Sequence, residues 1–241
     1  MKTKTIVVFL LILCKLNLYS QSGQIIYEAE MRMGNLNDIR EAKISKKTKS
    51  LLLLTFKNQE KVKYNLEFNK KESIFKKVEK LKIDKNIFNI AENKIKGIFY
   101  TNKKSKKILH QKESFDQLFL ITVPQFNWKL SQESKKIGEY ICYKATTTKD
   151  IESRRGKSTI KITAWYTTKI PFNYGPKDYN GLPGLILELQ EGELLIKSSL
   201  ISLFPKKECK IKQPIKGKKV TLKEFDSIVK KIVLSSKRYR K

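Results

Sequence analysis

The sequence predicts a mainly β protein: a large antiparallel meander sheet that can curl into a half-barrel, with one C-terminal α-helix. Two observations support this fold class. Apolar and polar residues alternate with the period of a strand along many short segments, most clearly over 159–168. The clearest helical spacing of apolar residues begins only at Thr221, near the end of the chain. We therefore expect a single sheet that is covered or flanked by a late helix.

The chain begins with the layout of a secretory signal. Two lysines precede the apolar run 6–13, and Ser20 and Ser22 supply small side chains at positions that a signal peptidase reads. The run is too short to span a bilayer. We expect residues 1–22 to be a signal peptide cleaved after Ser22 or after Ser20, and the protein to be periplasmic or secreted. The alternatives are acylation at Cys14 and an apolar first strand of a cytosolic protein.

The remaining residues, 23–241, are long enough to bury one substantial core and are expected to form a single domain. The formal charge of the whole chain is +29, and removal of three leader lysines leaves +26. Such a charge favours an anionic partner, such as an acidic polysaccharide or membrane headgroups. The lysines are scattered, however, and outnumber the arginines by 46 to 6. Specific phosphate recognition favours arginine, so a solvated surface is the simpler interpretation and no specific nucleic-acid binding is expected.

The first half of the mature chain predicts a series of short strands joined by polar turns. Alternation begins within 23–33, and Val62, Tyr64, Leu66 and Phe68 share one face of another strand. The segment 73–93 fits neither period cleanly and is interpreted as one or two short strands with loops. The expected strands are 23–33, 51–56, 62–68, 95–101, 107–112 and 115–123, with 51–56 and 62–68 forming a hairpin and 34–47 forming a loop.

The second half continues the meander and ends in the helix. Strands are expected at 128–130, 140–147, 159–168, 185–189 and 194–203, with 131–138 as a connection and 205–219 as irregular chain. Pro183-Gly184 suits the centre of a type II turn, and Glu191-Gly192 suits a hairpin. Thr221 and Glu224 form a capping box at the helix start. The apolar stripe of this helix is expected to dock on the sheet, and a position on a membrane surface is the alternative.

Proline and glycine gather most densely between Ala164 and Leu189, and this segment resembles the GLPGLI family of exported bacterial proteins. The resemblance is strong between about residues 128 and 189 and fainter over the rest of 23–241. Tyr179 stands where the family pattern leads us to expect phenylalanine. The resemblance implies an exported β-rich domain and carries no established enzymatic activity. The residues of the motif are Trp165, Tyr166, Pro171, Gly175, Pro176, Gly181, Leu182, Pro183, Gly184, Leu185 and Ile186.

Residues that could perform chemistry are few. His110 is the only histidine, so a catalytic triad or dyad that needs an imidazole would have to use it, and no motif stands beside it. Phosphate-binding glycine loops and metalloprotease motifs are missing from the sequence. The carboxylates of Glu188, Glu191 and Glu193 are interpreted as solvated residues of a hairpin tip. We therefore expect no catalytic, cofactor-binding or metal-binding residues and no cofactor.

The two cysteines of the mature chain and the aromatic residues near the motif each have two possible interpretations. Cys142 and Cys209 are the cysteines left after export, and an oxidising compartment permits a disulfide between them. Burial of Cys142 in a strand is the alternative. Several aromatic residues near the motif could line an apolar site or fill the core beneath the proline-rich loop. The candidate lining residues are Trp128, Trp165, Phe172, Tyr174 and Tyr179.

These observations favour an exported, non-enzymatic binding or accessory module of the bacterial envelope. An apolar ligand or an envelope protein would be held on a face of the sheet, and no transmembrane span is expected in the mature chain. One alternative is a basic surface protein that binds an anionic polymer or membrane headgroups. Another is a hydrolase or thiol enzyme that uses Cys142 or His110.

Overall fold

The structure, a computed structural model, describes residues 22–32, 41, 44–57, 60–79, 89–153, 156–204 and 209–238. Twelve strands in these ranges form one sheet. The strands are β1 (Ser22–Met31), β2 (Val62–Asn69), β3 (Glu72–Lys77), β4 (Ile98–Asn102), β5 (Lys107–Ser114), β6 (Gln117–Val123), β7 (Lys129–Ile137), β8 (Tyr140–Ser153), β9 (Gly156–Thr167), β10 (Leu185–Glu191), β11 (Leu194–Phe204) and β12 (Lys218–Thr221). The helices are α3 (Lys46–Lys57), α4 (Ile90–Lys94) and α5 (Leu222–Arg238).

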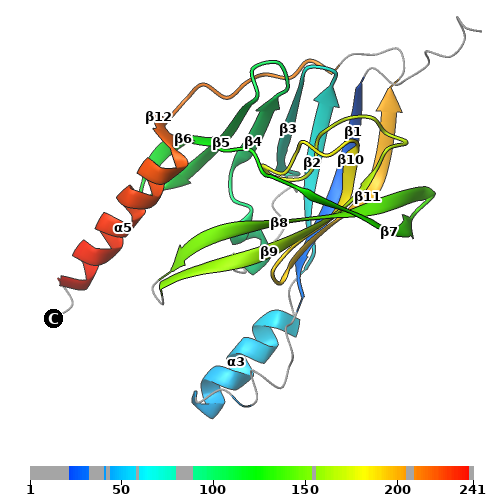
Figure 1. Cartoon of the computed structure of the whole chain (residues 1–241). Helices are drawn as coiled ribbons and strands as arrows, with labels where there is room; N and C mark the ends of the chain where they lie inside the picture. The colour runs from blue at the N-terminus through cyan, green and yellow to red at the C-terminus, as the bar shows by residue number, and fades with distance from the viewer. Residues whose placement is uncertain are drawn as a thin grey trace, which may run out of the picture.

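The sheet is open and almost entirely antiparallel. Its order is β12-β6-β5-β4-β3-β2-β1-β11-β10-β9-β8-β7, so β12 and β7 form the two edges. Every neighbouring pair is antiparallel except β12 and β6, which are parallel. Strands β7, β8 and β9 cross the direction of β1 to β6 at a steep angle, which gives the sheet a strong twist (Figure 1). The prediction of a mainly β fold with a large antiparallel sheet and a C-terminal helix is confirmed.

Alternation along β1 defines the two faces of the sheet. Ile25, Tyr27 and Ala29 are fully buried and belong to the inner face, whereas Gln24 and Ile26 belong to the outer face and are half-buried. The register carries the inner face across the sheet, because paired residues point to the same side. One row of the inner face runs through Ile25, Leu66, Phe75, Phe99, His110 and Ile121.

One predicted strand is a helix. The segment 51–56 was expected to pair with β2, but it lies within α3 (Lys46–Lys57). Ser45 caps this helix, since its hydroxyl oxygen accepts a hydrogen bond from the Thr48 amide at 3.1 Å. The run of consecutive leucines lacks the period of two, and leucine and lysine both favour helices. Leu51 and Leu54 remain exposed, and α3 projects below the sheet (Figure 1).

Two segments predicted as irregular chain contribute to the sheet. The expected connection 131–138 is mostly part of β7, which reaches Ile137. The expected irregular segment 205–219 contains the start of β12, the parallel edge strand. The chain before β12 covers the outer face of the neighbouring strands, where Ile211 packs on Tyr100, Leu109 and Leu120. Strand β12 could not be predicted from the sequence, because its four residues are too few to show an alternation of apolar and polar side chains.

Helix α5 docks on the inner face at the β12 edge, as expected. Phe225 meets Phe119 edge to face with ring centroids 5.1 Å apart. Leu222, Ile228 and Val229 pack on the same cluster of buried residues, which consists of Ile108, Phe119, Ile121, Val123, Val220 and Phe225. In the part of the chain that the structure describes, no helix has the length and apolar character needed to cross a membrane.

The predicted capping box of α5 is present and gives a first testable prediction. The Thr221 hydroxyl accepts from the Glu224 amide at 3.2 Å, and Glu224 Oε2 accepts from the Thr221 amide at 2.7 Å. Thr221→Ala is expected to destabilise the helix by about 1 kcal/mol, because one helix N–H loses its partner. Hydrogen exchange of the α5 amides measures this loss. Thr221→Ser retains the hydroxyl and should exchange like the parent, so equal losses in both variants would contradict the capping role.

Candidate functional site

The motif loop, residues 168–184 between β9 and β10, lies over the inner face of the sheet (Figure 1). Phe172 packs on Phe68 of β2 with ring centroids 4.7 Å apart. Backbone bonds fix the loop, since the Ile186 amide donates to the Tyr174 carbonyl at 3.0 Å. Its apolar residues Ile170, Phe172, Tyr174, Tyr179 and Leu182 are all buried. The predicted arrangement of strand, ordered loop and strand is confirmed. The apolar side chains of the loop form part of the hydrophobic core.

Gly184 was predicted to supply the positive φ of a type II turn, but the structure gives it a different role. A type II turn at Pro183-Gly184 requires a positive φ at the glycine, and Gly184 does not have one. Instead, a Cβ at Gly184 would lie 2.1 Å from the Thr167 carbonyl oxygen, so this glycine permits close backbone approach. The positive φ is found at Gly181, where it is +90°. The turn prediction was therefore wrong in geometry, although the position is restricted to glycine.

The five aromatic residues proposed to line an apolar site do not share one. Phe172, Tyr174 and Tyr179 are buried in the core, and Trp128 lies beside Tyr179, with its indole nitrogen donating to the Asn180 carbonyl at 2.8 Å. Trp165 belongs to the opposite face, because it alternates with the buried Ala164 and Tyr166 along β9. The Lys135 ammonium lies 4.4 Å from its ring centroid. The core interpretation of these aromatics is the one the packing supports.

A cluster of charged side chains lies under the motif loop. Lys177 pairs with Glu191 at the end of β10, and both side chains are largely buried. Lys149 of β8 lies 3.7 Å from Asp178 and 3.9 Å from Glu191. The loop is therefore tied to two strands by ion pairs. We call Lys149, Lys177, Asp178 and Glu191 the buried charge cluster.

The charges in this cluster stabilise one another against burial. Burial alone would raise the pKa of Asp178, but Lys149 and Lys177 outweigh it and hold that pKa below its ordinary value. The pKa of Glu191 is lowered in the same way, with Lys177 as the stronger partner. Burial would lower the pKa of Lys149, and Asp178 and Glu191 raise it instead. All three groups are thus charged at neutral pH.

The buried charge cluster was missed in the sequence. Glu191 was interpreted as a solvated turn residue, yet its side chain is 13% exposed and paired. The partners come from β8, the motif loop and β10, and no spacing along the chain indicates that they meet. A weak signal was available in Lys177 and Asp178, two charges inside a loop that is otherwise rich in apolar and aromatic residues.

His110 lies near the cluster but is held by other groups. Its ring stacks on Phe99 with centroids 4.0 Å apart, and its Nε2 lies 2.8 Å from the Lys96 carbonyl oxygen and donates to it. Burial lowers the pKa of His110 to about 4, because the hydrogen bond to Lys96 and the charge of Asp178 compensate only in part. Lys112 and Lys177 lower it further. The imidazole is therefore neutral over the physiological range.

The depressed pKa of this single histidine predicts an acid-dependent loss of stability. The unfolded chain binds a proton at His110 below about pH 6.5, whereas the folded chain resists protonation down to about pH 4. Stability should therefore fall by about 3 kcal/mol between these values as pH decreases. Urea unfolding at several pH values measures the slope. His110→Gln, which can still donate to Lys96, should flatten the upper part of this window; an unchanged slope would contradict the assignment.

Cys142 and Cys209 are both free in the structure, as in the alternative in which Cys142 is buried in a strand. Cys142 lies in β8, is fully buried and has its sulfur 3.8 Å from the Tyr140 carbonyl oxygen. Cys209 lies beside Gly23 of β1, with a sulfur to carbonyl distance of 4.0 Å. Strands β9, β10 and β11 separate β8 from β1 in the sheet. Burial raises the pKa of Cys142 to about 11, which leaves its thiol protonated at neutral pH.

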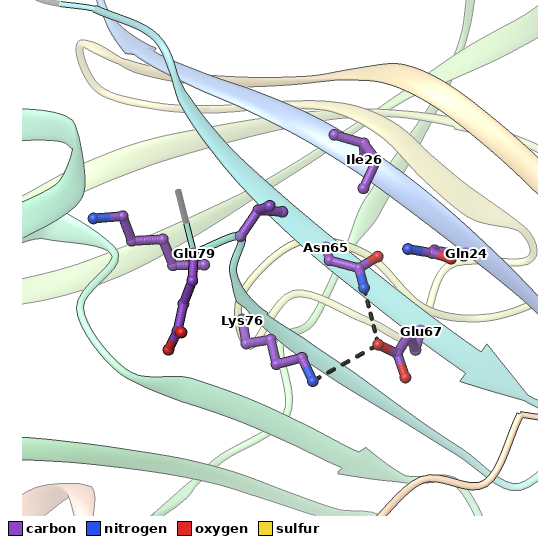
Figure 2. Close-up of a pocket in the computed structure, with 8 residues that line it drawn as sticks. Gln24, Ile26, Asn65, Glu67, Lys76 and Glu79 are labelled. Carbon is purple, nitrogen blue, oxygen red and sulfur yellow. Dashed lines mark hydrogen bonds and ion pairs between the residues drawn. The ribbon is translucent and has the colours of Figure 1, made fainter. Parts of the chain in front are cut away.

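The outer face carries an open hollow across β1, β2 and β3. Its volume is about 370 Å³, within the range of small-ligand sites. Figure 2 shows Asn65, Glu67 and Lys76 converging in it, with Gln24 and Ile26 facing them from β1. We call this feature the outer hollow. Its lining residues are Gln24, Ile26, Asn65, Glu67, Lys76, Lys77, Val78 and Glu79.

Asn65 is the central residue of the outer hollow. Its amide nitrogen donates to Glu67 Oε1 at 2.9 Å, and Lys76 Nζ lies 3.7 Å from the same oxygen (Figure 2). The side-chain carbonyl oxygen of Asn65 is buried and has no hydrogen-bond partner. A buried polar atom without a partner is unfavourable, and such atoms usually bind water or a ligand. Asn65 can therefore accept a hydrogen bond from a donor group that reaches this oxygen beneath the surface of the hollow.

The outer hollow was also missed in the sequence. Asn65 and Glu67 alternate with core residues along the predicted strand 62–68, so they could be placed on the solvent side. Which neighbouring strands flank them depends on the order of the sheet, and β1 pairs β2 only through a long-range contact. Across the described ranges, three or more His, Cys, Asp or Glu side chains do not gather as a metal site would require.

The fold and its sites define an open, mainly β domain in which the motif loop covers the inner face of the sheet. Residues 128–161 and 148–188 match a family model described as "Protein of unknown function (Porph_ging)". The matched region contains β7 to β9, the motif loop and the start of β10. It coincides with the segment in which the sequence most strongly resembles the GLPGLI family. No curated protein matches the chain.

Two solved structures are similar over most of this chain. A structure of PNGF-II in a C2 space group has 14% identity and a TM-score of 0.49, covering 87% of this chain and 33% of that chain. A structure of PNGF-II in a P21 space group has 16% identity and a TM-score of 0.47 with the same coverage. The chain therefore spans about a third of the length of PNGF-II.

Proposed function

We propose that the protein is an exported, non-enzymatic binding or accessory module of the bacterial envelope that holds its ligand or partner on the outer face of the sheet. The observation that carries this proposal is the unpartnered carbonyl oxygen of Asn65 within the outer hollow. The signal layout at the N-terminus and the resemblance to the GLPGLI family support export. The match to a family model of unknown function is compatible with that resemblance.

The inner face is unsuited to ligand binding because the motif loop occupies it. Five large loop side chains are buried there, and burying such a side chain contributes roughly 1.5 to 3 kcal/mol. Removing the loop would therefore require on the order of 10 kcal/mol, which is comparable to the whole stability of a domain. A groove under the loop is thus closed to ligands, and the outer face remains.

The chemistry of the outer hollow favours a neutral or zwitterionic polar group over a purely apolar ligand. The carboxylates of Glu67 and Glu79 and the ammonium group of Lys76 line it together with the amides of Gln24 and Asn65. Lys77 also lines it, but its ammonium group pairs with Glu92 of α4. Glu67 and Lys76 pair with each other, so groups of both signs face the hollow. Ile26 and Val78 supply apolar contact at the sides. The expected occupant presents a hydrogen-bond donor to Asn65 and a short apolar segment beside it, as a peptide group with its side chain does.

Site-specific photo-crosslinking tests this location. A photoreactive residue at Lys76, which is exposed and lines the hollow, should give an adduct in intact cells of a host that carries the native envelope partners. The same residue at Lys104, an exposed position between β4 and β5, is the matched control. Asn65→Leu should abolish the adduct at 76 while leaving the fold intact. An adduct that persists in Asn65→Leu would contradict the proposal.

The alternative function, binding of an anionic polymer by the basic surface, can be tested separately by its dependence on salt. Binding to an anionic polymer should weaken steeply with salt, because counterions are released from the polyanion. It should also be insensitive to Asn65→Leu, since the lysines lie along many segments. Salt-dependent binding to an acidic polysaccharide that Asn65→Leu leaves unchanged, without an adduct at position 76, would favour the anionic-surface function instead.

A further inference from the structure

The first strand begins before the residue that the small-residue rule selects as the mature N-terminus. Ser22 is the first residue of β1 and is fully buried. It is paired on both sides, with Asn69 of β2 and with Phe204 of β11. Cleavage after Ser22 would remove this residue from the centre of the sheet, since β1 has five or more strands on either side.

Gly23 is poorly suited to carry a terminal ammonium group. It is buried between Phe68 and Leu203, its partners on the two neighbouring strands. Space is limited there, because a Cβ at Gly23 would lie 2.6 Å from the Phe68 ring. A mature chain that began at Gly23 would place a charged amine in this apolar surrounding, and burying an unpaired charge is strongly unfavourable.

We propose that the mature protein begins at Gln21, through signal-peptide cleavage between Ser20 and Gln21. This inference rests on the proposed export of the chain. A cut after Ser22 has small side chains, Ser20 and Ser22, at both positions that the peptidase reads, whereas a cut after Ser20 has Ser20 beside it and the larger Leu18 two residues earlier. Residue type therefore favours the cut after Ser22, and it is the structure that favours the cut after Ser20. Only the product that starts at Gln21 retains Ser22 in β1 and moves the ammonium group two residues away from Gly23.

The mass of the exported protein tests the inference directly. The full chain with its own leader is produced in a bacterial host and purified from the envelope fraction, and its intact mass and N-terminal peptide are determined. The expected terminus is Gln21, either free or cyclised when its α-amine attacks the side-chain amide carbon and ammonia leaves. A terminus at Gly23 would overturn this inference and leave export standing. An intact Met1 terminus in the cytoplasmic fraction would contradict export itself.

Two proteins released from a cleavable fusion test the physical reason. One begins at Gln21 and the other at Gly23, and both otherwise contain the whole mature chain. The Gly23 form should melt at least roughly 5 °C lower, given the loss of Ser22 pairing and the buried amine. The difference should grow at acidic pH, where the amine is fully charged. Equal melting temperatures would remove the structural argument for a Gln21 start.

Discussion

Gly184→Ala is expected to lower the free energy of unfolding by about 3 kcal/mol, as severe overpacking does. The added Cβ would lie 2.1 Å from the Thr167 carbonyl oxygen and 2.7 Å from its carbon. These are backbone atoms of β9, so no side chain can rotate away to relieve the contact. Either the motif loop or the end of β9 must shift, and each is packed on the core. Urea unfolding monitored by tryptophan fluorescence measures the effect as a lower midpoint.

A second glycine provides the matched control. Gly138, in the turn between β7 and β8, has a φ of +58° and no atom within 4 Å of its expected Cβ. Gly138→Ala should therefore lower stability by only about 1 kcal/mol, the approximate penalty for a left-handed conformation. Both variants remove one glycine and add one methyl group. Equal destabilisation by the two substitutions would show that close approach at Gly184 is not what the motif requires.

Local patterns predicted the elements whose signal is contained within a few residues. Alternation located β1, β2 and β9, because a strand with one buried face repeats every two residues. The turn residues Pro183-Gly184 and Glu191-Gly192 placed β10 and β11, and the first five residues of β10 are buried on both faces. A capping box and an apolar stripe located α5 for the same reason. The leucine run of α3 failed because it has no alternation, and the cap at Ser45 lies several residues before the run. Sequence patterns predict a strand or a helix reliably where the spacing of its apolar residues matches the period of that element.

The sites depend on contacts that no local pattern encodes. Asn65 could be placed on the outer side of β2, but its missing partner becomes visible only when β1 and β3 flank it. Gly184 could be identified as a restricted position, but the restriction comes from Thr167, which lies across the motif loop. The sequence left the disulfide and the buried free cysteine as open alternatives for a similar reason, since an even number of cysteines carries no information on the order of the strands.

Lys177→Met is expected to destabilise the protein by about 3 kcal/mol at neutral pH, because it leaves two buried carboxylates, Glu191 and Asp178, with one lysine, Lys149, between them. Glu191 would lose the ion pair that ties the motif loop to β10, and Asp178 would retain only Lys149. Methionine keeps most of the aliphatic length of lysine, so the loss reports charge more than volume. The double variant Lys177→Met with Glu191→Gln should recover part of the loss. Urea unfolding of the three variants measures these differences.

The pH dependence of this loss distinguishes charge from packing. Asp178 and Glu191 have lowered pKa values in the fold, so their stabilising contribution is present above the unfolded pKa of about 4 and disappears as pH falls further. The gap between the parent and Lys177→Met should therefore shrink toward pH 3. Lys144→Met, which breaks the pair with the exposed Glu133, should change stability far less than Lys177→Met, because solvent screens this pair. A gap for Lys177→Met that is constant across this pH range would assign the loss to packing of the lysine stem, and the buried charge cluster would then not be what holds the motif loop.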